Sequence, residues 1–262
     1  MSDFPTAEAL AVPCFAGSVE DAADLVVTRA LSGEGGFAVL CNVHVLVTAQ
    51  RNTRLRDALE EAWAVFPDGA PIAWLLRRSG ERHANRVAGP DLMPATIEHG
   101  LAHGLRHFLL GSTPEVLGGL ECRLRKRFPV IEIAGTSAPF GDDAALDAVV
   151  TEIREARPHL VWCALGAPKQ ELWMRRNAAA LAPALALGVG AAFDFHAGTK
   201  ARAPRWLQRL GLEWLFRLAV ESRRLGRRYL TTNAAFVTSV AYDVCRHGRQ
   251  VRVSARSAER YR

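Results

Sequence analysis

The sequence predicts an α/β protein with a mostly parallel sheet flanked by helices, followed by a helical, basic C-terminal appendage. Short apolar runs that end in Gly, Asn or Asp alternate with helical patterns over residues 1–198. This alternation is typical of strand–helix–strand units and a parallel sheet. From Pro204 onward, consecutive helical patterns replace the alternation. Residues 199–262 hold 15 Lys and Arg but 4 Asp and Glu, whereas the first 198 residues hold 18 and 23.

The pattern assigns strands and helices in chain order. Pro114 suits the first position of a helix, and Arg125–Arg127 suit its negative end. The predicted strands are Phe37–Leu40, Ala64–Phe66, His107–Leu110, Val130–Ile133, Leu160–Leu165 and Leu185–Val189. The predicted helices include Leu55–Trp63, Pro114–Phe128 and Asp142–Ala156.

The chain divides into three predicted segments: an α/β core (residues 1–198), a helical appendage (199–242) and a basic tail (243–262) that we expect to be mobile. In the appendage, Trp206, Leu210 and Trp214 recur at helical spacing. Apolar and aromatic side chains on one side with arginines on the other are typical of a helix at a membrane interface. A local basic block predicts an anionic partner, which could be nucleic acid, an anionic membrane or phosphate groups.

Other classes of protein are not supported by the composition. The five cysteines have no metal-binding spacing, so we expect free thiols in a reducing cytosol. The first 15 residues lack the pattern of a signal peptide. The longest uncharged apolar run, Ala178–Phe193, is shorter than the roughly 20 residues of a membrane span. Neither HExxH, a GxxxxGK[ST] loop nor a DxD pair occurs, so we predict no metal and no cofactor.

Five loops follow the predicted strands, and ligands of open parallel sheets bind at that edge. Their glycines would let the backbone approach a phosphate beside helix N-termini. Gln170 could recognise a base or a sugar with its amide. The candidate binding residues in these loops are Asn42, Gly111, Gly166, Lys169, Gln170, Gly190 and Asp194.

Two aspartates and one arginine are further candidates. Taken alone, Pro67-Asp68-Gly69 is a common turn string, but Asp68 would also present a carboxylate, a general base, at a strand end. Asp91 is a further candidate for substrate binding and the alternative base, although we favour an N-cap of the helix that follows. Arg86 is either a surface residue or a bidentate partner of a diphosphate.

Two rival classes lack their motifs. Gly188-Val189-Gly190 begins like a dinucleotide fingerprint, but Phe193 stands where the third glycine belongs. This argues against an NAD-dependent Rossmann oxidoreductase. No nucleic-acid-binding motif accompanies the basic appendage, so we predict no nucleic acid partner.

Eight strings together resemble the WecG/TagA/CpsF family of bacterial glycosyltransferases. They fall in the family's order and span about residues 42–236. The strings are Val65–Gly69, Arg86–Leu92, Phe108–Gly111, Ala164–Glu171, Gly188–Phe195, Arg202–Pro204, Leu210–Trp214 and Arg227–Leu230.

The resemblance implies a Rossmann-like, inverting, metal-independent hexosyltransferase. Its donor would be a UDP-sugar, and its acceptor a polyprenyl-diphosphate-linked (undecaprenyl-type) saccharide of teichoic acid, common antigen or exopolysaccharide. By position in the motifs, Asp68 matches the proposed base. Asn42, Arg86 and Gln170 match residues implicated in substrate binding. The appendage would dock a cytoplasmic enzyme peripherally on the inner, anionic face of the cell membrane. Its arginines would bind diphosphate or lipid: Arg217, Arg223, Arg224, Arg227 and Arg228.

The sequence departs from the family's pattern at two positions. Leu40 stands where the family often has Thr, and His44 where it often has Glu. We interpret both as tuning of acceptor or sugar contacts, with a catalytically inactive relative as the alternative. The sequence leaves open whether the protein forms a homo-oligomer.

Overall fold

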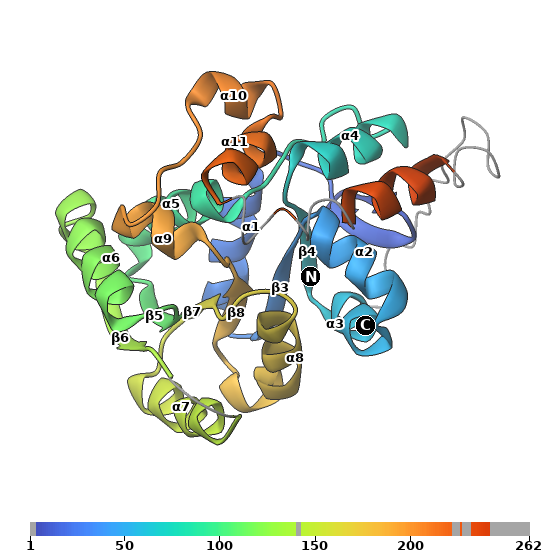
Figure 1. Cartoon of the computed structure of the whole chain (residues 1–262). Helices are drawn as coiled ribbons and strands as arrows, with labels where there is room; N and C mark the ends of the chain where they lie inside the picture. Colours follow the sequence, from blue (N-terminus) through green and yellow to red (C-terminus); the bar gives the residue numbers. More distant parts are fainter. Residues whose placement is uncertain (1–3, 140–142, 222–225, 227–231, 242–262) are drawn as a thin grey trace.

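A six-stranded sheet in which every pairing is parallel forms the centre of the protein (Figure 1). The computed structural model describes residues 4–139, 143–221, 226 and 232–241. The strand order is β4-β3-β8-β7-β5-β6. The strands are β3 (Gly36–Cys41), β4 (Ala64–Pro67), β5 (Arg106–Gly111), β6 (Glu132–Ser137), β7 (Leu160–Ala164) and β8 (Leu185–Gly188).

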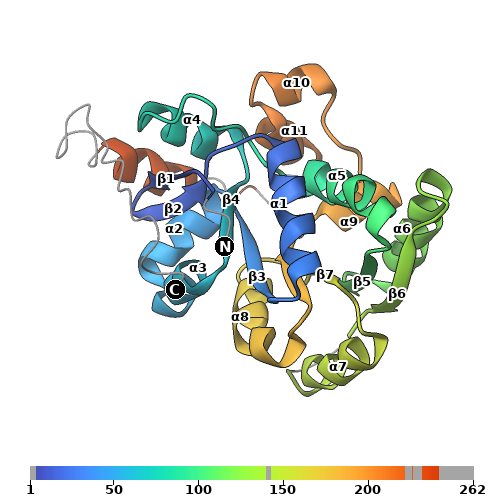
Figure 2. The same cartoon turned by 180° about the vertical axis from the view of Figure 1, so that it is seen from behind.

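Helices cover both faces of this sheet (Figures 1 and 2). The α/β, Rossmann-like prediction is therefore confirmed. The helices of the core are α1 (Val19–Ser32), α2 (Val43–Arg51), α3 (Thr53–Glu61), α4 (Ala70–Arg78), α5 (Gly89–Gly100), α6 (Pro114–Arg127), α7 (Asp143–Ala156), α8 (Lys169–Leu181) and α9 (Ala192–Ala197), with a short 3₁₀ helix η1 (Leu101–His103).

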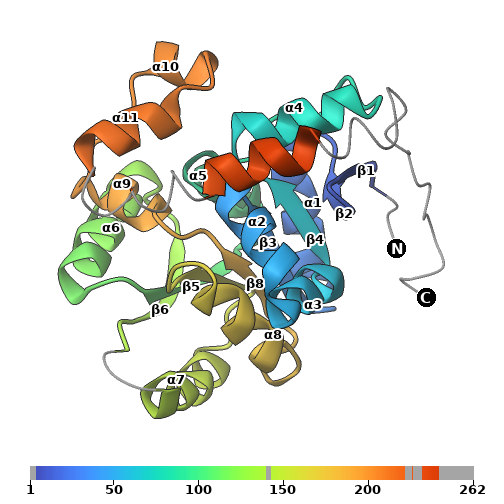
Figure 3. The same cartoon turned by 45° about the vertical axis from the view of Figure 1, so that its right-hand side comes forward.

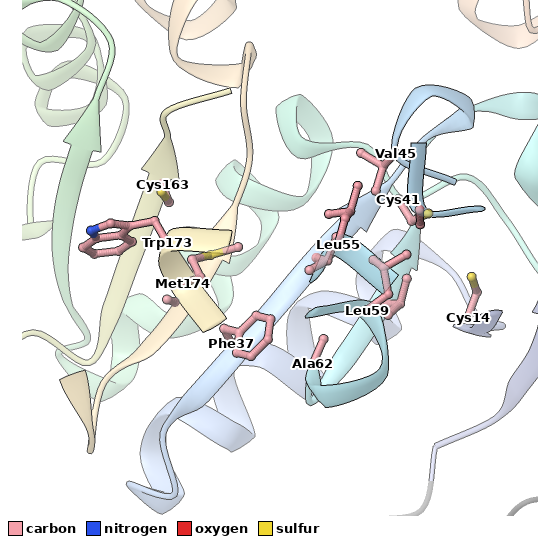
Figure 4. Close-up of a cluster of buried hydrophobic side chains, with 14 of the residues drawn as sticks. Cys14, Phe37, Cys41, Val45, Leu55, Leu59, Ala62, Cys163, Trp173 and Met174 are labelled. Atoms are coloured by element: carbon pink, nitrogen blue, oxygen red, sulfur yellow. The ribbon is translucent and has the colours of Figure 1, made fainter. Parts of the chain in front are cut away.

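Alternate residues of each strand enter two separate cores. In β3, Phe37 and Val39 pack with α2, α3 and α8, whereas Ala38 and Leu40 pack with α1 and α5. Figure 4 shows part of the first core, where Leu55 and Leu59 of α3 lie near Phe37. Because both of their faces are buried, β3, β4, β5, β7 and β8 are mainly apolar, as the interior of a parallel sheet requires.

Polar side chains fix where the helices begin. Ser18 and Asp21 form a capping box at the start of α1, with distances of 3.0 and 2.9 Å. Asn42 accepts a hydrogen bond from the Val45 backbone N–H at the start of α2, and Thr113 accepts one at the start of α6. These caps satisfy N–H groups that have no partner inside the helix.

One strand prediction was wrong in position. The apolar run Val130–Ile133 predicts a strand, but the strand is Glu132–Ser137 and Val130 is 71% exposed. The reason is that β6 is an edge strand, which pairs only with β5. Its side chains are therefore half-buried or exposed, and the apolar pattern that marks the central strands is absent.

A hairpin that the sequence pattern did not predict lies beside the sheet. Strands β1 (Thr6–Ala9) and β2 (Val12–Phe15) pair antiparallel, and the turn residues Leu10 and Ala11 have φ angles of 48° and 66°. Such turns usually contain Gly, Asn or Asp, none of which occurs in this turn. The ring of Phe15 packs edge-on against Phe66 of β4, with the centroids 5.4 Å apart.

Helices continue after residue 198, as predicted. They are α10 (Arg205–Arg209), α11 (Glu213–Val220) and a helical segment at 232–241. Figure 3 shows α10 and α11 above α9, and the segment 232–241 beside α4. The boundaries that we predicted at 198 and 242 remain predictions. Among the described helices, none is long and apolar enough to cross a bilayer.

We predict that His107 makes the fold sensitive to acid. Its side chain is buried, and its Nδ1 accepts a hydrogen bond of 3.1 Å from Trp162 Nε1. Burial, together with nearby His159, lowers the pKa of His107 from 6.5 to about 4. The unfolded chain therefore binds this proton more readily, and the free energy of unfolding should fall by about 3 kcal/mol between pH 6.5 and 4.

Urea unfolding at a series of pH values tests this prediction. His107→Gln should flatten the part of the profile between pH 4 and 6.5, whereas His103→Gln, which changes an exposed histidine, should not. Identical slopes for wild type and His107→Gln would contradict the assignment.

Candidate active site

A cavity of about 730 Å³ opens at the carboxyl edge of the sheet. On the side of the sheet, the cavity is lined by residues that follow β3, β4, β5, β7 and β8. Residues of α11 and of the helical segment 232–241 complete the lining. The predicted site residues that line this cavity are Asn42, Asp68, Arg86, Gly166, Gln170, Gly190, Asp194 and Arg217.

Asp68 stands directly after β4, where the chain turns into α4. Its backbone N–H donates to the Cys41 carbonyl at 2.9 Å, and Gly69 adopts a φ of 114° to begin α4. Burial raises the pKa of Asp68, against the opposing effects of nearby Arg86 and Arg217. A carboxylate that borders a cavity and binds protons more tightly than usual is suited to general-base chemistry.

Asn42 holds this carboxylate and the start of α2 together. Its Oδ1 accepts from the Val45 N–H at 3.2 Å, and its side chain also hydrogen-bonds Asp68. Each end of the amide therefore has a partner within the protein. We infer that Asn42, which the sequence suggested as a substrate-binding residue, orients Asp68.

Arg86 is engaged in an ion-pair network of four side chains. It donates to Glu213 and, at 2.9 Å, to Asp91. Arg202 donates to both oxygens of Asp91, at 2.7 and 2.6 Å, and its Nε lies 3.5 Å from Glu213. The network joins the loop before α5, α5 itself, the segment before α10 and α11. It thereby fixes α11 against the core.

The structure corrects the expected role of Asp91. The N-cap of α5 is Ala88, and Asp91 lies in the first turn. Burial alone would raise the pKa of Asp91, but the hydrogen bonds and charges of Arg202 and Arg86 lower it below its usual value. The Asp91 carboxylate is thus directed to two arginines and is not among the cavity-lining side chains.

Gly111 and Lys169 lie beside the cavity and do not line it. A Cβ on Gly111 would come within 2.8 Å of the Ala164 carbonyl, so this glycine lets β5 and β7 approach each other where they end. Lys169 begins α8. Their substrate-binding roles remain predictions. Arg223, Arg224, Arg227 and Arg228 lie outside the described residues.

Arg217 is a cation of the cavity wall. Its guanidinium lies 5.6 Å from the centre of the Phe195 ring, and its positive charge acts on Asp68. Its Nε has no hydrogen-bond partner within the part of the chain that the structure describes. Asp194, by contrast, is 3.4 Å from Lys200 Nζ, which also lines the cavity.

Sequence reasoning missed several groups of this site. Arg202 and Glu213 belong to strings that carry the family resemblance, but neither was proposed as a functional residue. Nothing in the local pattern indicates that Glu213 meets Arg86, 127 positions earlier in the chain. Within the described ranges, no three His, Cys, Asp or Glu side chains are grouped as metal ligands.

We predict that the network contributes to stability through Asp91. Asp91→Asn would leave Arg202 and Arg86 without this carboxylate in a half-buried place, which should lower the free energy of unfolding by about 1–3 kcal/mol. Urea unfolding measures the change. The matched control is Glu121→Gln, which removes a more exposed ion pair with Arg125 and should cost less than about 0.5 kcal/mol. Equal losses in the two variants would contradict the prediction.

Comparison with known families connects this geometry to an activity. The model of the glycosyl transferase WecG/TagA/CpsF family matches residues 7–250. The match includes every strand of the central sheet and all cavity-lining residues. It confirms the resemblance of the eight strings and implies that a sugar donor and a sugar acceptor meet in this protein. The chain belongs to the WecG/TagA/CpsF family of glycosyltransferases.

Proposed function

We propose that the protein is an inverting, metal-independent hexosyltransferase that moves a sugar from a UDP-sugar to a polyprenyl-diphosphate-linked saccharide. The product would enter a cell-surface polysaccharide. The observation that carries this proposal is the Asp68 carboxylate, which borders the cavity with a raised pKa and faces the charge of Arg217. The absence of a DxD pair from the sequence supports metal independence.

Asp68 acts as the general base in this mechanism. The acceptor hydroxyl oxygen attacks the anomeric carbon on the face opposite UDP, and Asp68 takes the hydroxyl proton. A bond forms between the acceptor oxygen and the anomeric carbon while the bond between the anomeric carbon and the diphosphate oxygen breaks. UDP leaves with the bonding electrons. Attack from the opposite face inverts the anomeric configuration.

Arg217 is the described residue best placed to stabilise the leaving diphosphate. Its guanidinium lines the cavity and its Nε has no protein partner in the described ranges. Arg86 also lines the cavity, but Glu213 and Asp91 already neutralise it. Arg86 can bind a phosphate fully only if Glu213 releases it. Stabilising charge that develops on the leaving group is usually the largest catalytic effect.

The surface formed by α4, α10 and α11 supports peripheral binding to the inner face of the cell membrane. These three helices lie on the same side of the molecule in Figure 1. Trp74 of α4 is 46% exposed, Trp206 of α10 is 62% exposed, and Arg78 lies 5.6 Å from the centre of the Trp74 ring. Tryptophans with neighbouring arginines are typical of surfaces that contact anionic lipid.

We predict that Asp68→Asn abolishes transfer. The variant cannot accept the proton, so UDP release should fall about 10²–10⁴-fold. The assay uses UDP-sugars with a short-chain polyprenyl-diphosphate-linked sugar in EDTA. The control is Asp57→Asn, which changes a half-exposed aspartate of α3 that pairs with Arg175 and does not line the cavity. Release at the wild-type rate by a folded Asp68→Asn would eliminate this base. If the folded wild type releases no UDP from any of the UDP-sugars tested, a catalytically inactive relative is the better explanation.

The raised pKa of Asp68 predicts two opposite pH effects. Activity needs the ionised carboxylate, so kcat/KM should fall with acidification at a pH above that of an ordinary aspartate. The contribution of Asp68 to the free energy of unfolding decreases as the pH rises, because the folded state binds this proton more tightly than the unfolded chain does. The wild type should therefore lose stability relative to Asp68→Asn as the pH rises from 3.8 through the raised pKa. Unfolding profiles that run parallel at all pH values would contradict this assignment.

We predict that the wild type sediments with anionic vesicles and less with neutral ones. Each Lys or Arg near an anionic surface contributes about 1 kcal/mol. Trp74→Ala and Trp206→Ala should each weaken sedimentation. Val130→Ala removes an exposed apolar side chain next to β6, away from these helices, and should have no effect. Equal sedimentation with anionic and neutral vesicles, or an equal loss of sedimentation in all three variants, would contradict the proposed surface.

A further inference from the structure

Two buried polar side chains stand at the start of α8. Gln170 is 4% exposed and Glu171 is fully buried. Gln170 Nε2 donates a hydrogen bond of 2.8 Å to Glu171 Oε1. Gln170 also lines the cavity, whereas Glu171 does not. Glu171 therefore contacts the site only through its neighbour.

This contact determines which end of the Gln170 amide is available to a ligand. A carboxyl group always has one oxygen without a hydrogen, whether or not it is protonated. That oxygen accepts from the amide nitrogen. Against an ionised Glu171, the reverse orientation would place the Gln170 carbonyl oxygen next to another acceptor, and the structure has Nε2 on Glu171 Oε1. Glu171 thus holds the nitrogen, and Gln170 Oε1 remains for another partner.

A glycine of β8 makes room for this amide. A Cβ on Gly188 would lie 2.9 Å from Met174 Cε and 3.0 Å from Gln170 Nε2, closer than side chains ordinarily approach. Gly190 lies near the other end of the amide, where a Cβ would make an ordinary contact of 3.8 Å with Gln170 Oε1, and its φ of 52° favours glycine. The space that Gln170 and Met174 need therefore explains Gly188.

Gln170 Oε1 is a buried acceptor without a partner among the residues that the structure describes. An unsatisfied buried carbonyl is unfavourable, because it loses its hydrogen bonds to water and gains none in the protein. Such groups are uncommon in native proteins, and each one calls for an explanation. Its position next to Gly190, which lines the cavity, indicates that a ligand supplies the missing donor.

We propose that Glu171 is a positioning residue that presents Gln170 Oε1 to a hydrogen-bond donor of the bound substrate. This inference rests on the proposed UDP-sugar donor. In that ligand, the donor group is the imide N–H of uracil, a hydroxyl of the ribose, or a hydroxyl or amide N–H of the transferred sugar. Phosphate oxygens without protons only accept hydrogen bonds, so the diphosphate must lie elsewhere, on the side of Arg217.

The first test measures the position of the amide without any ligand. In ¹⁵N spectra of the full chain, the Gln170 side-chain NH₂ should exchange slowly with solvent. Glu171→Met, which keeps the length of the side chain but removes the acceptor, should accelerate this exchange at least tenfold. Glu171→Gln keeps a carbonyl acceptor and should restore part of the protection. Unchanged exchange in Glu171→Met would overturn the positioning role.

The second test identifies the donor group by calorimetry with UDP, N3-methyl-UDP, the 2′-deoxy and 3′-deoxy analogues of UDP, and a UDP-sugar. If a ribose hydroxyl is the donor, Glu171→Met should reduce the preference for UDP over the matching deoxy analogue about tenfold. If the uracil imide is the donor, Glu171→Met should reduce the preference for UDP over N3-methyl-UDP about tenfold. If the sugar is the donor, the preference for the UDP-sugar over UDP should fall instead. Glu132→Met, the same change at an exposed glutamate, is the control.

The outcomes separate this inference from the proposed function. If all of these preferences are unchanged in a folded Glu171→Met, the role of Gln170 Oε1 is overturned. A wild type that binds none of these ligands would overturn the proposed donor and, with it, the ligand assigned to Gln170. The exchange measurement would in that case still decide whether Glu171 positions the amide.

Discussion

The parallel direction of all six strands is the constraint on which the site depends. Every strand that enters the sheet must end at the same edge, so segments far apart in the chain converge there. Asn42 and Asp68 follow neighbouring strands, β3 and β4, and this adjacency brings the amide to the carboxylate. The Gly188–Gly190 segment arrives from β8, the other neighbour of β3. Burial of both sheet faces keeps these strand ends in register.

Burial of charge at this edge sets the chemistry. Desolvation raises the pKa of Asp68, while the network around Arg86 contains two arginines and two carboxylates and is neutral as a whole. The network therefore attaches α11 without adding net positive charge. The cation that faces Asp68 from α11 is Arg217, and α11 occupies its position because of Glu213. Attachment of α11 to the core and placement of Arg217 beside Asp68 therefore depend on the same ion pairs.

Sequence patterns predicted the parts of the fold that burial dictates. The central strands and helices such as α6 and α7 carry the expected periodicity, because each buries a face. The edge strand β6 and the hairpin β1–β2 bury less and were misplaced or missed. The expectation that ligands bind where parallel strands end correctly predicted that Asp68 and Gln170 lie at the cavity. It could not foresee that Arg86 is bound by Glu213, since ion pairs between distant segments leave no local pattern.

Two carboxyl groups near the cavity, Asp68 and Glu171, show how burial can serve different ends. Desolvation raises the pKa of both groups. Asp68 borders the cavity, so its affinity for protons can act on a substrate hydroxyl. Glu171 is sealed beneath Gln170, so it can act only on the orientation of that amide. In the roles that we propose, access to the ligand, and not acidity, therefore separates the base from the positioning group. For the same reason, a substitution at Glu171 should alter which ligand is preferred, and one at Asp68 the rate at which it reacts.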